Sequence, residues 1–204
     1  MTAASKPINS ERSKFGYYAA MTIGVFAVGF SVLTIPFVLP AMRKHALPYI
    51  PATTKQVENV FKAINLYSKQ NNLNYSNPSG TNLVRLIDLG SGDGRIVFDA
   101  ASRGYHSTGV ELNTVLYLYS KIKSIINRLK GIENASNAHF KRADFWKINM
   151  KEYDLIIVFG VQEMMKELSS KIKDEMKPNT LIVSCRHPIS AYKSVFSYDD
   201  ELDR

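Results

Sequence analysis

A glycine-rich run at residues 88–95, Asp-Leu-Gly-Ser-Gly-Asp-Gly-Arg, most constrains how this chain can fold. It follows an apolar stretch at 83–87 and precedes a helical pattern at 96–102. A strand that ends in a glycine turn and opens a helix is the arrangement by which open α/β sheets approach a nucleotide-like ligand. The glycines let the backbone come close to a ligand because no Cβ stands in the way. The run therefore predicts a ligand site at the end of the first strand of an α/β sheet.

The spacing within this run distinguishes between ligands. It is Gly-x-Gly-x-Gly, not the Gly-x-Gly-x-x-Gly of dinucleotide sites, and Asp88 stands two residues before Gly90. Pyrophosphate at a helix N-terminus gains nothing from a neighbouring carboxylate. S-adenosylmethionine has no phosphate but carries a sulfonium cation and an amino-acid tail, so an acid in this turn is electrostatically favourable. The run favours this cofactor, and hence methyl transfer, although glycine turns occur in any Rossmann-like sheet.

Two further acids follow the next two predicted strands. Glu111 ends the strand candidate at 108–112, and a carboxylate there can accept both hydroxyls of a ribose. Asp144 follows the candidate at 138–143 and precedes Phe145 and Trp146. An acid followed by aromatics suits an adenine, because the carboxylate accepts from the exocyclic amine and a ring stacks on the base. Each acid alone could be a helix N-cap or a loop residue, but three acids at successive strand ends favour one cofactor site.

These motifs give a set of candidate site residues. The predicted cofactor-binding residues are Asp88, Gly90, Ser91, Gly92, Asp93, Gly94, Glu111, Asp144 and Phe145. Trp146 and Phe159 are candidates for the walls of a substrate pocket, with simple core packing as the alternative. Methyl transfer to an amine needs alignment and exclusion of water more than a catalytic triad, so no catalytic residue is assigned.

Composition excludes several other classes of protein. The one cysteine, Cys185, excludes an intrachain disulfide and a zinc cluster, and it lies in an apolar run where a buried inert thiol is expected. The four histidines show no metal-ligand spacing, so no metal site is expected. The formal net charge is +8, but half of it brackets an apolar N-terminal segment. That distribution favours a membrane surface or an import signal over a nucleic-acid groove.

The apolar N-terminal segment has the length of a membrane span. Residues 15–42 contain no charge, and the 21 residues from Phe15 to Ile35 would extend roughly 30 Å as a helix. Tyr17 and Tyr18 stand at one end, where aromatic rings prefer the membrane interface. We expect a transmembrane helix over 15–35, with a buried core helix as the alternative. Basic residues flank both ends, so the charge rule assigns no orientation.

The rest of the chain alternates between strand and helix patterns. A capping box, Thr53-x-x-Gln56, opens a helix that precedes a polar loop at 69–82. Strands are predicted at 83–89, 108–112, 138–143, 153–159 and 180–185, with helices at 96–102, 113–130 and 161–176 between them. This order predicts an α/β, Rossmann-like, doubly wound parallel sheet. Only 19 residues follow Cys185, so the C-terminal antiparallel hairpin of a class I methyltransferase sheet is expected to be incomplete.

The same patterns predict how the chain is divided. The expected parts are a basic N-terminal tail at 1–14, a transmembrane or targeting segment at 15–42, a linker at 43–52 and a methyltransferase domain at 53–204.

Several motifs together resemble the membrane-anchored mitochondrial lysine methyltransferases that modify the c-subunit of ATP synthase and the adenine nucleotide translocase. The resemblance covers roughly 37–188. Its most specific element is Pro-Tyr-Ile-Pro-Ala-Thr-Thr-Lys-Gln-Val-Glu-Asn-Val at 48–60, and the runs 88–95, 111–113, 144–147 and 185–188 follow in family order. Phe159-Gly160-Val161 and Met164-Met165 resemble the c-subunit branch more than the translocase branch. The asparagine-rich loop at 69–82 is longer than in the family and the C-terminus is shorter.

The resemblance implies an S-adenosylmethionine-dependent protein-lysine N-methyltransferase of the mitochondrial inner membrane, with the ATP synthase c-subunit as its protein substrate. The translocase remains an alternative acceptor. An RNA or small-molecule methyltransferase tethered to a membrane, and a catalytically silent anchored scaffold, are the rival functions. Methyltransferases of nucleobase or amide nitrogens often carry an Asn/Asp-Pro-Pro-aromatic turn after the fourth strand, whereas this chain has Phe159-Gly160-Val161-Gln162. This difference argues against a nucleobase acceptor, and no nucleic-acid partner is expected.

Overall fold

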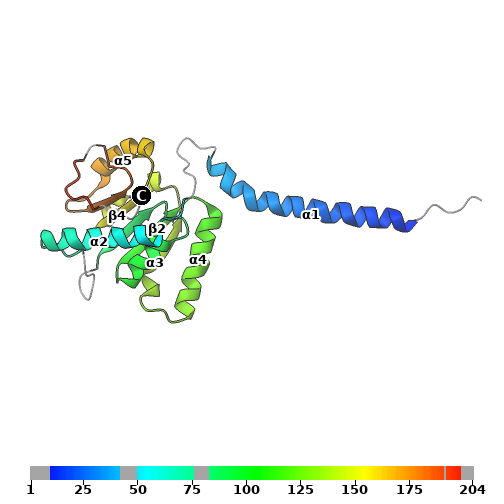
Figure 1. The fold of residues 1–204 in the computed structure, drawn as a ribbon, viewed down its shortest axis with the longest axis horizontal. Coiled ribbons are helices and arrows are strands. Elements are labelled where there is room, and N and C mark those ends of the chain that lie inside the picture. Colours follow the sequence, from blue (N-terminus) through cyan, green and yellow to red (C-terminus); the bar gives the residue numbers. More distant parts are fainter. Residues whose placement is uncertain (1–9, 42–49, 76–82, 191, 199–204) are drawn as a thin grey trace, which may run out of the picture.

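The computed structural model describes residues 10–41, 50–75, 83–190 and 192–198. A long helix, α1 (Ser10–Ala41), extends away from an α/β domain (Figure 1). The domain contains α2 (Thr54–Gln70), β1 (Arg85–Leu89), α3 (Arg95–Ser102), β2 (His106–Glu111), α4 (Thr114–Leu129), β3 (Ala138–Arg142), β4 (Leu155–Phe159), α5 (Gln162–Glu175) and β5 (Leu181–Cys185). Short 3-10 turns lie at Ala135–Asn137, Phe145–Lys147 and Met150–Glu152. Parts of the predicted tail (1–9), linker (43–49), polar loop (76–82) and domain (191, 199–204) lie outside the described residues.

The strands form one sheet in the order β3-β2-β1-β4-β5, and every pairing is parallel. The chain winds outward from β1 in one direction through β2 and β3, and then crosses to β4 and β5. The carboxyl ends of β1 and β4 therefore form a topological switch point, where open α/β sheets bind their ligands. The predicted doubly wound α/β sheet is confirmed. In the described part of the chain no strand follows β5.

Two buried clusters cover the two faces of the sheet. On one face α2 inserts Phe61 and Ile64 against side chains of β1 and β4 such as Leu86 and Leu155. On the other face α5 inserts Met165, Leu168 and Ile172 among residues of the same two strands. β4 is buried on both faces, which explains why its sequence is continuously apolar and not alternating. β1 is buried from Leu86 to Leu89, with Asp88 as the one polar residue in that stretch. The switch point is thus held by the most tightly packed strands of the domain.

Four of the predicted boundaries shift by two residues. α2 continues to Gln70, two residues into the predicted polar loop, and its capping box at Thr53 and Gln56 is formed as expected. β1 begins at Arg85 and not at residue 83, because Leu83 is largely exposed.

The starts of two other strands also differ from the prediction. β2 begins at His106 and not at residue 108, because His106 already pairs with Arg85. β4 begins at Leu155 and not at residue 153, and its pairing with β1 begins there, opposite Leu86. None of these changes moves a candidate site residue.

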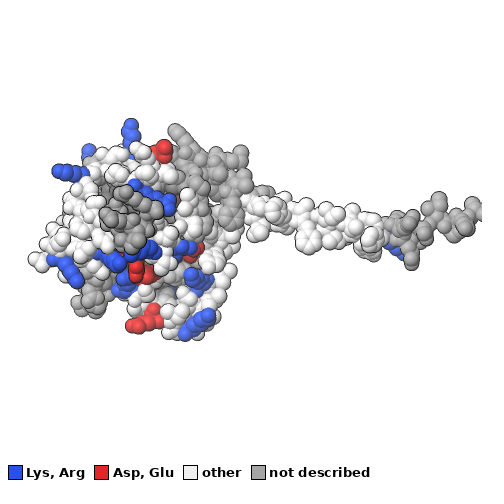
Figure 2. Space-filling view, in the orientation of Figure 1, with Lys and Arg blue, Asp and Glu red and all other residues white. Residues whose placement is uncertain are grey.

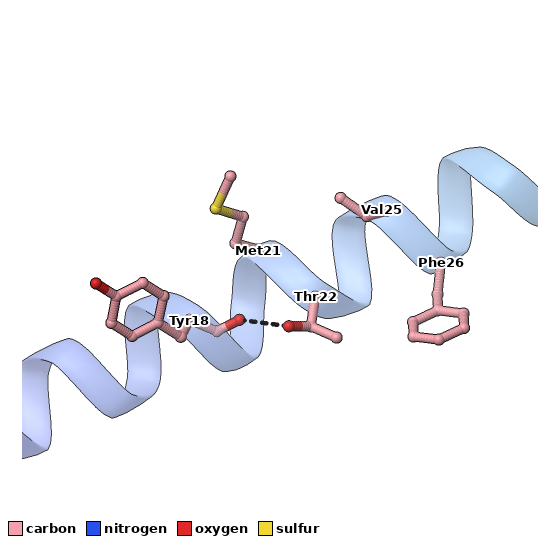
Figure 3. A pocket seen from close by; sticks show the side chains of 5 residues that line it. All are labelled: Tyr18, Met21, Thr22, Val25 and Phe26. Atoms are coloured by element: carbon pink, nitrogen blue, oxygen red, sulfur yellow. Dashed lines mark hydrogen bonds between the residues drawn. The ribbon is translucent and has the colours of Figure 1, made fainter.

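Within the described residues α1 contains one stretch long and apolar enough to cross a membrane, Lys14–Thr34, and none of it is buried against the domain. Two of its threonines bond within the helix. The Thr22 hydroxyl donates to the Tyr18 carbonyl at 2.8 Å (Figure 3). The Thr34 hydroxyl donates to the Phe30 carbonyl at 2.9 Å. The polar groups of a helix in lipid must form hydrogen bonds within the helix, because hydrocarbon offers no hydrogen-bond partner. The shallow hollow between Tyr18 and Phe26 in Figure 3 lies on the side of this helix, away from the switch point.

Candidate cofactor and active site

The candidate residues gather at the carboxyl edge of the sheet. The glycine run leaves the end of β1, Glu111 ends β2, Asp144 follows β3 and Phe159 ends β4. Parallel register places these ends side by side, since Leu89 pairs with both Val110 and Val158, and Glu111 pairs with Arg142. The predicted convergence of three strand-end acids is therefore what the topology produces.

The glycine run folds as a tight turn between β1 and α3. Gly90, Gly92 and Gly94 have φ of 82°, 54° and 79°, in the left-handed region that favours glycine. The amides of Gly90 and Ser91 both donate to the Val110 carbonyl, at 2.9 and 3.0 Å. The Gly94 amide donates to the Ser91 carbonyl at 2.8 Å and Gly94 caps α3. The turn is thus fixed to β2 before any ligand is present.

The glycines of this turn differ in what surrounds them. A Cβ on Gly90 would meet nothing within 4 Å, so this glycine borders open space. A Cβ on Gly94 would lie 2.6 Å from a ring carbon of Phe140, so this glycine is required for packing. A Cβ on Gly109 would lie 2.6 Å from the Ser91 hydroxyl, so this buried hydroxyl faces β2, and among the described residues it has no hydrogen-bond partner. The open space beside Gly90 is where a ligand could pass close to the backbone of the turn.

Glu111 holds the turn and the next helix together. One carboxylate oxygen accepts from the Gly92 amide at 2.8 Å, and the other accepts from the Asn113 amide at 2.7 Å. Hydrogen bonds to a charged acceptor are roughly twice as strong as neutral ones. A carboxylate oxygen has two lone pairs, so these bonds leave capacity for hydroxyl donors. Glu111 therefore has a structural role that the sequence did not reveal, in addition to the predicted ribose role.

Asp88 lies within β1, as the predicted strand at 83–89 has it, just before the glycine turn. It is 2% exposed. Burial, followed by the nearby carboxylates of Glu111 and Asp93, raises the pKa of Asp88 to about 8. A cation that enters this site would favour the ionised carboxylate and lower that pKa. The electrostatics of the site therefore suit a positively charged ligand, as the sulfonium and ammonium groups of the predicted cofactor require.

Asp93 forms an ion pair with Arg95. Its carboxylate pairs with the Arg95 guanidinium at 2.6 Å, and Arg95 also donates to the Ala52 carbonyl just before α2. This pair connects the glycine turn to the segment that precedes α2. Asp93 thus positions the entrance of the site, and nothing in its geometry directs it at the predicted cofactor.

The residues after β3 form a compact turn. An Asp144 oxygen accepts from the Trp146 amide at 3.2 Å, which is the N-cap role weighed as an alternative. The rings of Phe145 and Trp146 lie 4.8 Å apart and both pack partly against the α5 side of the sheet. Phe159 packs on the α2 side instead. The two proposed pocket walls therefore border the strand ends from opposite faces, and neither is fully buried in the core.

Two residues of the site were missed by the sequence reasoning. Asn113 is buried and caps α4 through bonds from the Val115 and Leu116 amides. Ser120, in the second turn of α4, donates to the Gly92 carbonyl at 3.2 Å. A signal for Asn113 existed, since Asn directly before a helical pattern is a typical N-cap. Nothing in the local sequence marks Ser120, because its partner is 28 residues away.

With this geometry in view, the chain matches two family models. Residues 88–196 match the ANTKMT methyltransferase domain, and residues 12–43 match the N-terminal domain of the ATP synthase C-subunit lysine N-methyltransferase. An ATP synthase C-subunit lysine N-methyltransferase of Caenorhabditis elegans is 41% identical over 174 residues, which cover 85% of this chain and 84% of the relative. The chain belongs to this lysine N-methyltransferase family. The human relative of the same name is 35% identical over 91% of this chain and 71% of its own.

Membership makes the chain an S-adenosylmethionine-dependent lysine N-methyltransferase, as the sequence motifs predicted. A solved RNA methyltransferase of Salinibacter ruber, in complex with S-adenosyl-L-homocysteine, shares the fold with a TM-score of 0.60 at 20% identity. The match covers 74% of this chain and 88% of that one. The sheet of this chain and its switch point therefore have a known methyltransferase fold.

Proposed function

We propose that this methyltransferase modifies a lysine of the ATP synthase c-subunit at the mitochondrial inner membrane. The observation that carries the proposal is the match of residues 12–43 to an N-terminal family model named for that activity. This segment is separate from the methyltransferase fold, so its match adds information beyond the shared chemistry. The curated relatives of that name cover most of both chains, including the domain.

We propose one orientation for the cofactor at the carboxyl edge of the sheet. We assign its ribose to Glu111, its cationic tail to the region of Asp88 and the open side of Gly90, and its adenine to Asp144 and Phe145. Ser91, Gly92 and Gly94 shape the turn beneath it, and Asp93 holds the turn through Arg95. The bound cofactor supplies an electrophilic methyl group on a sulfonium. The support for this arrangement is the open space at Gly90 and the acidic surroundings of Asp88.

The protein's own contribution to the transfer is alignment. A lysine amine must lose its proton, whose unperturbed pKa is about 10.4, before its nitrogen can attack. An apolar channel lowers that pKa by disfavouring the ammonium form. We place this channel at the edge between Trp146 and Phe159, whose partly buried rings stand on either side of the strand ends. Such walls would exclude water and orient the amine without a dedicated base.

The proposed contact with the membrane is helix α1. We assign residues 15–35 as a single-pass anchor, with 43–52 as the linker and 53–204 as the methyltransferase domain. The exposed apolar surface of α1 and its internally bonded threonines support this assignment. An anchored enzyme meets a membrane-embedded substrate in two dimensions, which raises the effective concentration of a lysine near the bilayer surface.

The deciding experiment measures the intact mass of the ATP synthase c-subunit from cells that lack this protein. Loss of methyl increments, about 14 Da each, from one lysine is expected, and re-expression of the wild-type chain should restore them. Re-expression of a Glu111→Ala variant at equal abundance should restore fewer. An unchanged c-subunit mass contradicts the proposal. If the same cells lose methylation on the adenine nucleotide translocase instead, the translocase is the acceptor.

A further inference from the structure

Helix α4 carries an exposed apolar stripe along its outer side. Its members recur three and four residues apart, which places them on one face of a helix. They are Leu118, Tyr119, Ile122, Ile125, Ile126 and Leu129, each between 42% and 82% exposed. Six large side chains in one contiguous stripe exceed the scattered apolar residues of an ordinary soluble surface.

The same helix faces the sheet with serines. Ser120 and Ser124 are its buried residues, and their hydroxyls donate to the carbonyls of Gly92 and Ala138. Each helical residue advances about 100°, so the direction of Ser120 and Ser124 is nearly opposite to that of Ile122 and Leu129. The amphipathic pattern of α4 is therefore inverted, with small polar residues toward the protein and large apolar residues away from it. Such a helix needs an apolar environment outside the domain.

Basic residues border the apolar stripe on both sides. Lys121 and Lys130 fall on opposite margins by the same helical advance, and both are exposed with no ion-pair partner in the described part of the chain. Figure 2 shows basic side chains beside uncharged ones where α4 forms the outer edge of the domain in Figure 1. Long basic side chains beside an apolar face are typical of helices that lie in a membrane interface.

A basic hollow adjoins one of these margins. It has a volume of about 320 Å³ and is lined by Lys121 together with Arg85, Lys141 and the stacked rings of His106 and His139, against the single acid Glu152. Burial and then the surrounding cations lower the pKa of His139. The surface next to α4 is thus positively charged, which favours contact with anionic lipid headgroups.

The tether keeps this surface close to a bilayer. α1 ends at Ala41 and α2 begins at Thr54, and the twelve intervening residues span at most roughly 45 Å when fully extended. A domain of this size has a diameter of about 40 Å by the usual scaling of compact chains. The tether therefore keeps the domain within about one domain diameter of the membrane whenever α1 is inserted.

We propose that α4 lies in the membrane interface, with its stripe of Leu118, Ile122, Ile125 and Leu129 among the acyl chains and its flanking lysines at anionic headgroups. This proposal rests on the proposed anchor, because the tether is what brings α4 to the bilayer. It makes α4 a second membrane contact, which fixes how the domain faces the lipid. A second copy of the chain or a protein partner on the same stripe is the competing occupant.

The test uses the full chain in vesicles of phosphatidylcholine with a minor fraction of phosphatidylglycerol. An environment-sensitive fluorophore is placed at Ile125→Cys, in a Cys185→Ala background, and quenched by lipids that carry a spin label on the acyl chain. The matched control is Leu66→Cys, on α2, where the native side chain is 41% exposed, against 49% for Ile125. A third label at Val25→Cys reports on α1 itself. Several-fold stronger quenching at position 125 than at position 66 is the expected result.

Each other outcome separates this proposal from the anchor. Quenching at position 25 but no more at 125 than at 66 leaves α1 in the bilayer and overturns the α4 contact. A blue shift at position 125 without lipid quenching also overturns it, since protein then covers the stripe. Quenching at 125 without quenching at 25 removes the spanning anchor and keeps the interfacial helix. The further substitutions Ile122→Asp and Leu129→Asp should abolish quenching at position 125 while the circular dichroism of the domain is retained.

Discussion

Gly90 and Gly94 allow the cofactor turn to be tested with two matched single-methyl substitutions. Both glycines have a positive φ, 82° and 79°, so an alanine at either position incurs a similar left-handed strain of about 1–2 kcal/mol. They differ in their surroundings. The Cβ at position 90 would meet nothing within 4 Å, whereas the Cβ at position 94 would lie 2.6 Å from Phe140 and 3.0 Å from the Ser120 hydroxyl.

These surroundings predict opposite effects on stability and on binding. Gly94→Ala adds overpacking of about 1–3 kcal/mol to the strain, so we expect a total loss of roughly 2–5 kcal/mol in the free energy of unfolding. Gly90→Ala should lose only the strain. It places its methyl group in the space assigned to the cofactor, however, and should weaken binding of S-adenosylmethionine by at least about tenfold, or ~1.4 kcal/mol.

Urea unfolding of the two variants, together with calorimetric titration of S-adenosylmethionine into each, gives both quantities. Equal destabilisation by the two substitutions would show that the contact at Phe140 does not control packing. Unchanged affinity in a folded Gly90→Ala variant would place the cofactor elsewhere and refute the assignment of the open space beside Ser91.

Individual side chains give three further predictions. Because Asp88 holds its proton between about pH 4 and 8 only in the folded chain, the cofactor-free protein should lose stability as pH rises through that window, as measured by thermal unfolding. Over the same window the affinity of the wild-type chain for the cofactor should rise by up to about tenfold per pH unit more than the affinity of the Asp88→Asn variant. Identical pH profiles of affinity in the two proteins would refute the role of this carboxylate. Glu111→Ala should cost roughly 1–3 kcal/mol in unfolding free energy and at least about tenfold in cofactor affinity, whereas Glu111→Gln, which keeps one acceptor, should lose less. Cys185 is only partly buried, but desolvation by its surroundings raises the pKa of its thiol well above its usual range, so thiol reagents should modify the native chain much more slowly than the unfolded chain, and equal labelling rates would contradict this.

The sequence predicted the parts of the site that depend on local chemistry. A glycine turn between a strand and a helix needs only the residues of that turn, and its left-handed angles at Gly90 and Gly94 follow from the absence of a side chain. The capping box at Thr53 and Gln56 is local in the same sense. The position of Glu111 at the end of β2 was equally visible, because alternating strand and helix patterns fix where each strand ends.

The contacts between these parts depended on strand register, which local patterns do not supply. Glu111 reaches the Gly92 amide only because Leu89 pairs with Val110 in the folded sheet. Asp88 is held within the strand because both β2 and β4 pair along β1 as far as Leu89. The sequence also did not predict that Ser120 faces the sheet. Helical periodicity identifies an apolar face of a helix, but it does not say whether that face packs against the domain or points away from it.

The inverted helix α4 connects the proposed membrane contact to the cofactor turn. Its N-cap, Asn113, donates its amide to Glu111, and the other oxygen of the same carboxylate accepts from Gly92. Further along the helix, Ser120 donates to the Gly92 carbonyl. The inner side of α4 is thus bonded directly to the turn that approaches the cofactor, while its outer side is the stripe proposed to lie in lipid. If α4 is seated in the interface, the orientation of the methyl-transfer site relative to the bilayer is fixed by two short hydrogen-bonded connections. A lysine presented at a constant depth by a membrane-embedded substrate would then meet the site at a constant height.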